Sequence, residues 1–150
     1  MIELKFSIGL DSFENGNFIY IWIDGANLPF YVGETGKSPI DRAGLHIRDK
    51  SRSGAIVSKI IQLRSAQKQD YTVLAFPIED ELLTRVCQEN GASTSNASYN
   101  RARKAIERAV YEELSKKFKD LHKARGCNWQ AKSGVEYVKY VCEQCIKKGA

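Results

Sequence analysis

Long hydrophobic runs are missing from this chain, and so are the residues that mark secreted or repetitive proteins. No stretch approaches the roughly 18 apolar residues of a membrane-spanning helix, and the first six residues lack the charged-then-apolar order of a signal peptide. With 3 prolines and 11 glycines in 150 residues there is no low-complexity tract, repeat or linker. We therefore expect one domain over residues 1–150, in the cytoplasm and without a membrane partner.

Cysteine is also sparse, with 4 residues and a single close pair. Cys142 and Cys145 have the spacing of half a zinc site. Two more ligands would complete it, and the candidates are Cys127 together with either Cys87 or His122. Both members of the pair fall on the apolar side of a predicted helix, which favours small buried hydrophobes. Zinc at this pair stays the alternative.

The charge balance is mildly basic, with a formal net charge of +5 and a pI of about 9.0. This excess of Lys and Arg suits a polyanionic partner such as a nucleic acid. It equally fits a well-solvated basic surface, so charge alone does not identify a partner.

Alternating and apolar segments predict the strands. Residues 2–10 carry an apolar side chain at every second position, which indicates a half-buried N-terminal strand. Residues 18–23 are rich in β-branched and aromatic side chains, and a turn at 24–27 joins them to a second strand at 30–33. The nearly all-apolar residues 71–78 predict a central strand.

Capping residues and helical spacing predict five helices. The first spans about 38–49, with Ser38 as N-cap and Pro39 at the first helical position. The others span about 55–66, 79–90 and 99–122, and a last one follows a capping box at Ser133 and Glu136. Because helices and strands interleave, we expect one α/β (α+β) domain.

Motif residues in a particular order resemble the GIY-YIG endonuclease family. Tyr20 closes the first motif, in which Phe18 stands where the family has glycine, and Tyr31 opens the second, Tyr-Val-Gly. Arg42 and His46 follow at helical spacing. The resemblance covers about residues 13–130 and implies a small, mainly antiparallel three-stranded sheet flanked by helices, with the N-terminal strand and the C-terminal helix as additions.

The resemblance also extends to a glutamate and an asparagine. Glu107 matches the family's metal-binding glutamate, and Asn128 resembles its asparagine near the end of the domain. Glu34 follows the second motif where some relatives have a basic residue. The implied cofactor is Mg²⁺ (or Mn²⁺), and the implied activity is hydrolysis of phosphodiester bonds.

Phosphodiester hydrolysis needs an activated water and positive charge at the phosphate. One Mg²⁺ held by Glu107 and water supplies part of that charge, and Arg42 is suited to a bidentate phosphate contact. By resemblance Tyr20 or Tyr31 acts in proton transfer, and His46 titrates near neutrality and could relay a proton. As a base, a tyrosine requires a lowered pKa.

The expected partner is DNA, with RNA or a non-cleaving nucleic-acid-binding role as alternatives. Lys37, just before a helix start, is a candidate phosphate contact. The other candidate nucleic-acid-binding residues share one predicted helix and are Arg101, Arg103, Lys104 and Arg108. Each of these residues has an ordinary alternative role in packing or on a solvated surface. The sequence leaves both a monomer and a homodimer open.

Overall fold

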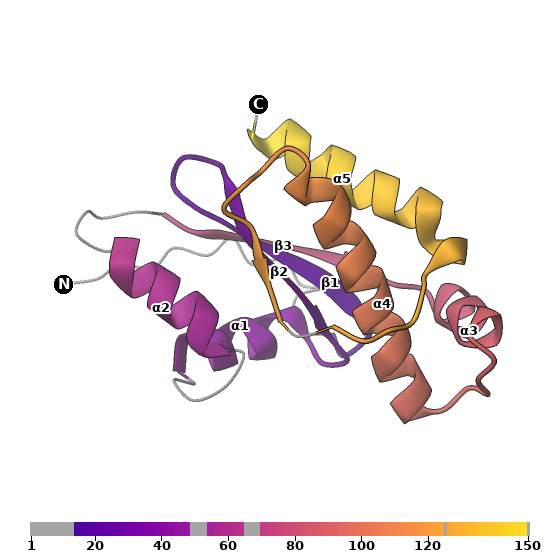
Figure 1. The fold of residues 1–150 in the computed structure, drawn as a ribbon. Helices are drawn as coiled ribbons and strands as arrows, with labels where there is room; N and C mark the ends of the chain where they lie inside the picture. The colour runs from indigo at the N-terminus through magenta and orange to yellow at the C-terminus, as the bar shows by residue number, and fades with distance from the viewer. Residues whose placement is uncertain (1–13, 49–53, 65–69, 125, 150) are drawn as a thin grey trace.

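The computed structural model describes residues 14–48, 54–64, 70–124 and 126–149, and these form a sheet with helices on both faces (Figure 1). The strands are β1 (Phe18–Ile23), β2 (Pro29–Thr35), β3 (Thr72–Pro77) and β4 (His122–Lys123), in the order β3-β1-β2-β4. The helices are α1 (Pro39–Arg48), α2 (Gly54–Arg64), α3 (Asp80–Glu89), α4 (Asn96–Ser115) and α5 (Val135–Gly149), with the short 3-10 helix η2 at Lys132–Gly134. The expected α+β class is confirmed.

The β1–β2 hairpin is antiparallel and forms the middle of the sheet. The side chain of Asp24 closes its turn by accepting hydrogen bonds from the backbone N–H groups of Ala26 and Leu28, at 2.9 and 3.0 Å. Asn27 takes a left-handed conformation there, with φ of 60°, which asparagine tolerates better than most residues. The resulting register pairs Tyr20 with Gly33.

Both faces of β1 are buried, because each face contacts its own layer of helices. Ile19, Ile21 and Ile23 pack in one hydrophobic cluster with residues of α3, α4 and α5. Tyr20 and Trp22 point to the opposite face and pack in a second cluster with residues of α1 and α2. This two-residue alternation places Tyr20 and Trp22 of β1 under α1.

The sheet differs from the expected one at both edges. Residues 71–78 were expected to form a central strand, but among the described strands β3 pairs with β1 alone and lies at the edge of that sheet. On the other side β4 pairs in parallel with Tyr31 and Val32 of β2, so the described sheet has four strands rather than three. This short strand covers part of the backbone edge that β2 would otherwise expose.

The long helix is shorter than predicted at its C-terminus. We expected it to reach residue 122, but α4 ends at Ser115. The backbone N–H groups of Lys117 and Phe118 both donate to the carbonyl of Leu114, at 3.0 and 2.9 Å. The chain turns away at this point, Leu121 packs into the core, and β4 follows.

The predicted capping box before α5 is wrong. Both the backbone N–H and the hydroxyl of Ser133 donate to the carboxylate of Glu89 in α3 instead. Val138, Val141, Cys142 and Cys145 form the buried face of α5, whereas its first residue is exposed. The expected strand at residues 2–10 lies outside the described residues. None of the helices in the described segments combines the length and apolarity that a bilayer span requires.

Candidate functional site

Tyr20 stands at the centre of the candidate site, on the α1 side of β1. Its ring lies directly over the backbone of Gly33, where a Cβ atom would come within 2.2 Å of the Tyr20 hydroxyl. Any larger residue at Gly33 would therefore displace the phenol. The glycine of the second motif thus has a steric role, which is to let the hydroxyl of Tyr20 cross β2.

Helix α1 brings two further side chains to that hydroxyl. The helix begins where Ser38 caps the backbone N–H of Asp41 (3.3 Å), and Arg42 and His46 follow one turn apart. Tyr20 Oη forms a short hydrogen bond with His46 Nε2 and accepts one from Arg42 Nε at 3.2 Å. The predicted convergence of Tyr20, Arg42 and His46 is present in the structure.

Tyr31 completes this group of rings from β2. Its ring centroid lies 6.2 Å from that of Tyr20 and 5.2 Å from that of His46. The exposed fractions of Tyr20, Tyr31 and His46 are 2%, 0% and 1%, so solvent reaches the group mainly through Arg42, which is half-buried. We refer to Tyr20, Tyr31, Arg42 and His46 as the tyrosine cluster.

Burial decides how the two phenols titrate. It raises the pKa of Tyr20 to about 12, even though the charge and the hydrogen bond of Arg42 act in the opposite direction. Burial also raises the pKa of Tyr31, and neighbouring Tyr20 raises it further. Burial therefore outweighs the effect of Arg42, and the pKa of each phenol is raised rather than lowered.

Glu107 of α4 is a buried carboxylate, with only 2% of the residue exposed. Its Oε1 atom has no hydrogen-bond partner among the described residues. The pKa of Glu107 is raised to about 8, because burial and the charge of Glu34 raise it more than Lys123, Lys104 and Arg42 lower it. An unpartnered buried carboxylate is costly, and a cation would stabilise its charged form.

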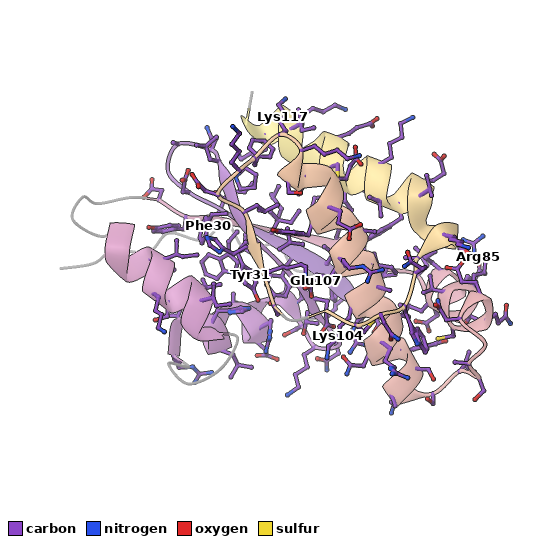
Figure 2. All side chains as sticks on the ribbon, viewed as in Figure 1. Phe30, Tyr31, Arg85, Lys104, Glu107 and Lys117 are labelled. Atoms are coloured by element: carbon purple, nitrogen blue, oxygen red, sulfur yellow. The ribbon has the colours of Figure 1, made fainter. Side chains whose placement is uncertain are left out.

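Glu107 lies on α4, in the helix layer opposite the one that covers the tyrosine cluster (Figure 2). Within the described segments no hydrogen bond connects it to the tyrosine cluster, yet its charge is close enough to raise the pKa values of Tyr20 and Tyr31. Mg²⁺ keeps most of its coordinated water, so one ion can connect groups that do not touch each other. A single Mg²⁺ or Mn²⁺ held by Glu107 and water fits this arrangement.

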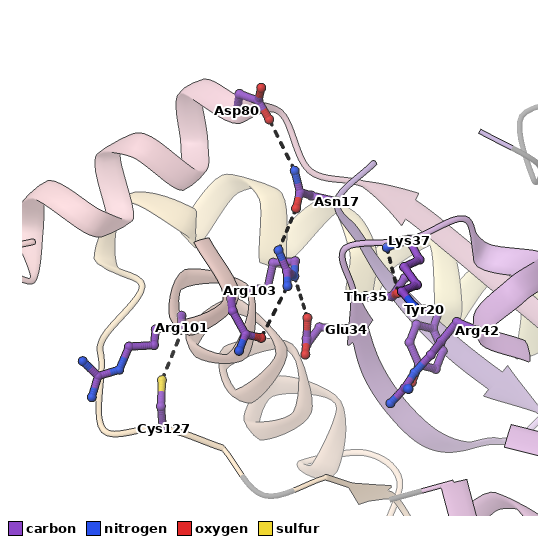
Figure 3. Close-up of polar contacts among 11 residues, drawn as sticks. Asn17, Tyr20, Glu34, Thr35, Lys37, Arg42, Asp80, Arg101, Arg103 and Cys127 are labelled. Atoms are coloured by element: carbon purple, nitrogen blue, oxygen red, sulfur yellow. Dashed lines mark hydrogen bonds and ion pairs between the residues drawn. The ribbon is translucent and has the colours of Figure 1, made fainter. Parts of the chain in front are cut away.

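Two of the four arginines and lysines expected to bind nucleic acid on α4 are engaged within the protein. Arg103 donates to Glu34 at 2.6 Å and to Asn17 at 2.8 Å, and Asn17 in turn donates to Asp80 at 3.4 Å (Figure 3). Arg108 donates to the backbone carbonyls of residues 127 and 129, at 2.9 and 2.7 Å. These contacts tie α4 to neighbouring segments.

The remaining predicted residues are more accessible. Arg101 is exposed and lies over the ring of Trp129, 5.2 Å from its centroid, and Lys104 is half-buried. Lys37 is exposed on the turn between β2 and α1, with its backbone N–H bound to the hydroxyl of Thr35. Asn128 is exposed on the segment after β4, and no described hydrogen bond joins it to the tyrosine cluster.

Sequence reasoning missed the pairing of Glu34 with Arg103. The sequence feature that could have predicted this pair is Glu34 itself, directly after the second motif. A half-buried carboxylate at the end of a strand needs a cation nearby. The pair connects β2, which carries Tyr31, with α4, which carries Glu107. It therefore contributes to the relative placement of the two halves of the site.

The cysteine pair lies in the core. Cys142 and Cys145 are buried with Val138 and Val141 against α4, and burial raises the pKa of Cys142 to about 11 and that of Cys145 to about 12. Among the described residues no group of three or more His, Cys, Asp and Glu side chains is arranged to hold a metal. A site built from one carboxylate and water is not such a group.

Comparisons with models of known protein families, with curated proteins and with solved structures found no match for this chain. The resemblance to the GIY-YIG nucleases therefore stays a prediction from the motif residues of the sequence.

Proposed function

We propose that this chain is a metal-dependent endonuclease that hydrolyses phosphodiester bonds in DNA. The observation that carries the proposal is the phenol of Tyr20, held between the imidazole of His46 and the guanidinium of Arg42. Arg42 is the cation, Tyr20 the proton carrier and His46 the proton acceptor, and hydrogen bonds of Tyr20 join the three groups. An ordinary packing tyrosine needs only one hydrogen-bond partner.

The directions of these hydrogen bonds support a proton relay. Arg42 can only donate, so the Tyr20 oxygen accepts from Arg42 Nε, and the relay uses the His46 tautomer whose Nε2 accepts the Tyr20 proton. As a water oxygen attacks phosphorus, its proton passes to the Tyr20 oxygen while the Tyr20 proton passes to His46. The P–O bond to the leaving sugar breaks, and that oxygen takes a proton from solvent.

This scheme makes His46 the final proton acceptor. With a pKa of about 12, Tyr20 does not lose its proton to solvent at neutral pH, but in the relay it never carries a net charge. A neutral imidazole is suited to take up the proton. Tyr31 packs against both rings and holds them in place.

Arg42 and Glu107 would offset the negative charge of the phosphate, Arg42 directly and Glu107 through a bound divalent ion. The terminal nitrogens of Arg42 are suited to a bidentate contact with the scissile phosphate while its Nε stays on Tyr20. Glu107 would hold the divalent ion, Mg²⁺ or Mn²⁺, which supplies positive charge at the phosphate. The four cysteines are free thiols, which suits action in the reducing cytoplasm.

The test is incubation with supercoiled plasmid and with single-stranded RNA, with and without Mg²⁺. We expect Mg²⁺-dependent nicking of the plasmid by the wild-type chain. Tyr20→Phe and Glu107→Gln should lower the rate by at least about a hundredfold, whereas Tyr140→Phe, at an exposed tyrosine, should cut normally.

Three outcomes would contradict parts of the proposal. Binding of DNA without any cutting would indicate a non-cleaving nucleic-acid-binding module. Cleavage of RNA with an intact plasmid would indicate an RNA-directed nuclease. Normal nicking by Tyr20→Phe would remove the relay.

A further inference from the structure

A cleft of about 670 Å³ opens beside the tyrosine cluster, between the turn before α1 and the first turns of α4. We propose that this cleft binds the nucleotide next to the scissile phosphate on the strand that is cut, with Lys37 contacting its phosphate. This inference rests on the proposed nuclease function and adds a substrate-binding subsite to it. The volume is in the range of cavities that enclose small ligands, enough for one or two nucleotides.

The charges of the cleft favour an anion. Its walls carry three basic side chains and two acidic ones. Both acidic side chains have partners, because Glu34 accepts from Arg103 and Asp80 accepts from Asn17. Of the basic side chains, that of Lys37 is exposed on the turn before α1 and is the one best placed to attract a ligand.

Arg42 connects the cleft with the site of chemistry. Its Nε atom donates to the hydroxyl of Tyr20, and the same residue lines the cleft. A phosphate bound to the outer nitrogens of Arg42 therefore lies at the boundary between the two. Lys37 lines the cleft from the turn that leads into α1 and can meet the neighbouring phosphate of the same strand.

The opposite wall offers groups suited to a base. Tyr99 and Asn96 line the cleft from the first turn of α4, and the hydroxyl of Tyr99 lies 3.0 Å from that of Thr84, which fixes its ring. Aromatic rings stack on bases, and asparagine amides pair with base edges. A strand that runs from Arg42 past Lys37 would therefore turn its base toward α4.

Arg103 shapes this cleft and is not its phosphate contact. Its guanidinium donates to Glu34, Asn17 and Asn100 and lies against Gly36, where a Cβ atom would come within 3.1 Å of it. Its hydrogen-bonding capacity is largely used inside the protein. Arg103 thus forms the floor of the cleft, which leaves Lys37 as the cation for the second phosphate.

The test uses the Glu107→Gln chain, so that substrate binds without being cut. Titration with a hexathymidylate, followed by amide chemical shifts in NMR spectra, should shift Gly36, Lys37, Asn96 and Tyr99 first. In the same background Lys37→Ala should weaken binding about tenfold and lower the slope of log affinity against log salt by about 1. The matched control Lys117→Ala, near the far end of α4 (Figure 2), should do neither.

Any other result would contradict either the proposed nucleotide binding in the cleft or the proposed nuclease activity. Shifts centred on another surface, or equal effects of Lys37→Ala and Lys117→Ala, would overturn the subsite while wild-type nicking of plasmid stands. The same shifts with inorganic phosphate alone, at similar affinity, would reduce the cleft to a general anion site. Binding in the cleft by a wild-type chain that never nicks would instead overturn the proposed nuclease and keep the subsite.

Discussion

Replacing Glu107 with glutamine removes a buried proton-binding group while keeping the size of the side chain. Burial raises the pKa of Glu107 from 4.5 to about 8 in the folded protein, with the charge of Glu34 adding to the rise. Between these two pH values the folded state holds a proton that the unfolded state has lost. The stability that this group contributes is therefore fully present below pH 4.5 and is lost as pH rises through 8.

The size of the effect follows from the change in pKa. Each pKa unit corresponds to about 1.4 kcal/mol, so the full change is worth about 4 to 5 kcal/mol. Such a value is a large part of the total stability of a small domain. Glutamine has no proton to lose, so the free energy of unfolding of wild type minus that of Glu107→Gln should fall by about this amount across the window.

The assay is urea denaturation of both proteins at several pH values from below 4.5 to above 8. All other ionisable groups are shared, so they largely cancel in the difference. The matched control is Glu112→Gln at an exposed position of the same helix, for which the change across the window should be much smaller than for Glu107→Gln. Added Mg²⁺ at the alkaline end should stabilise wild type and not Glu107→Gln, because binding to the folded state raises its stability.

If the difference in free energy of unfolding between wild type and Glu107→Gln does not change with pH, the carboxylate is ionised and hydrated in the folded protein. The reasoning about burial would then be refuted. Equal stabilisation of wild type and Glu107→Gln by Mg²⁺ would separately remove Glu107 as the metal ligand.

Two further substitutions test the tyrosine cluster. Gly33→Ala should push the Tyr20 ring aside, because the new methyl group would lie 2.2 Å from its hydroxyl. We expect the free energy of unfolding to fall by about 1 to 3 kcal/mol and plasmid nicking to be lost. The control Gly44→Ala, where the nearest neighbour of the new methyl group is 3.8 Å away, should keep both its stability and its nicking activity. Arg42→Lys should lower kcat for plasmid nicking by about a hundredfold, since lysine cannot bind the phosphate through two nitrogens while also donating to Tyr20. The control is Arg48→Lys, at an exposed position of α1. Equal nicking rates for the two variants would show that Arg42 has no direct role in the reaction.

The sequence by itself determined those parts of the fold that depend on neighbouring residues. The β-branched and aromatic residues 18–23 and the turn at 24–27 predicted the β1–β2 hairpin, and Ser38 with Pro39 predicted the start of α1, because caps and turns are satisfied locally. The four-residue spacing of Arg42 and His46 placed both on one face of that helix. Their meeting with Tyr20 was expected from the family resemblance alone, because the residues themselves do not show which face of the hairpin α1 covers.

Only the tertiary structure decided what lies against each side chain. A helical pattern does not show whether Arg103 meets solvent or a carboxylate, and here it meets Glu34, which is 69 residues away along the chain. The edge position of β3 and the pairing of β4 depend on contacts of the same long range. The raised pKa values of Tyr20 and Glu107 follow from burial, a property of the packed layers that no short stretch of sequence contains.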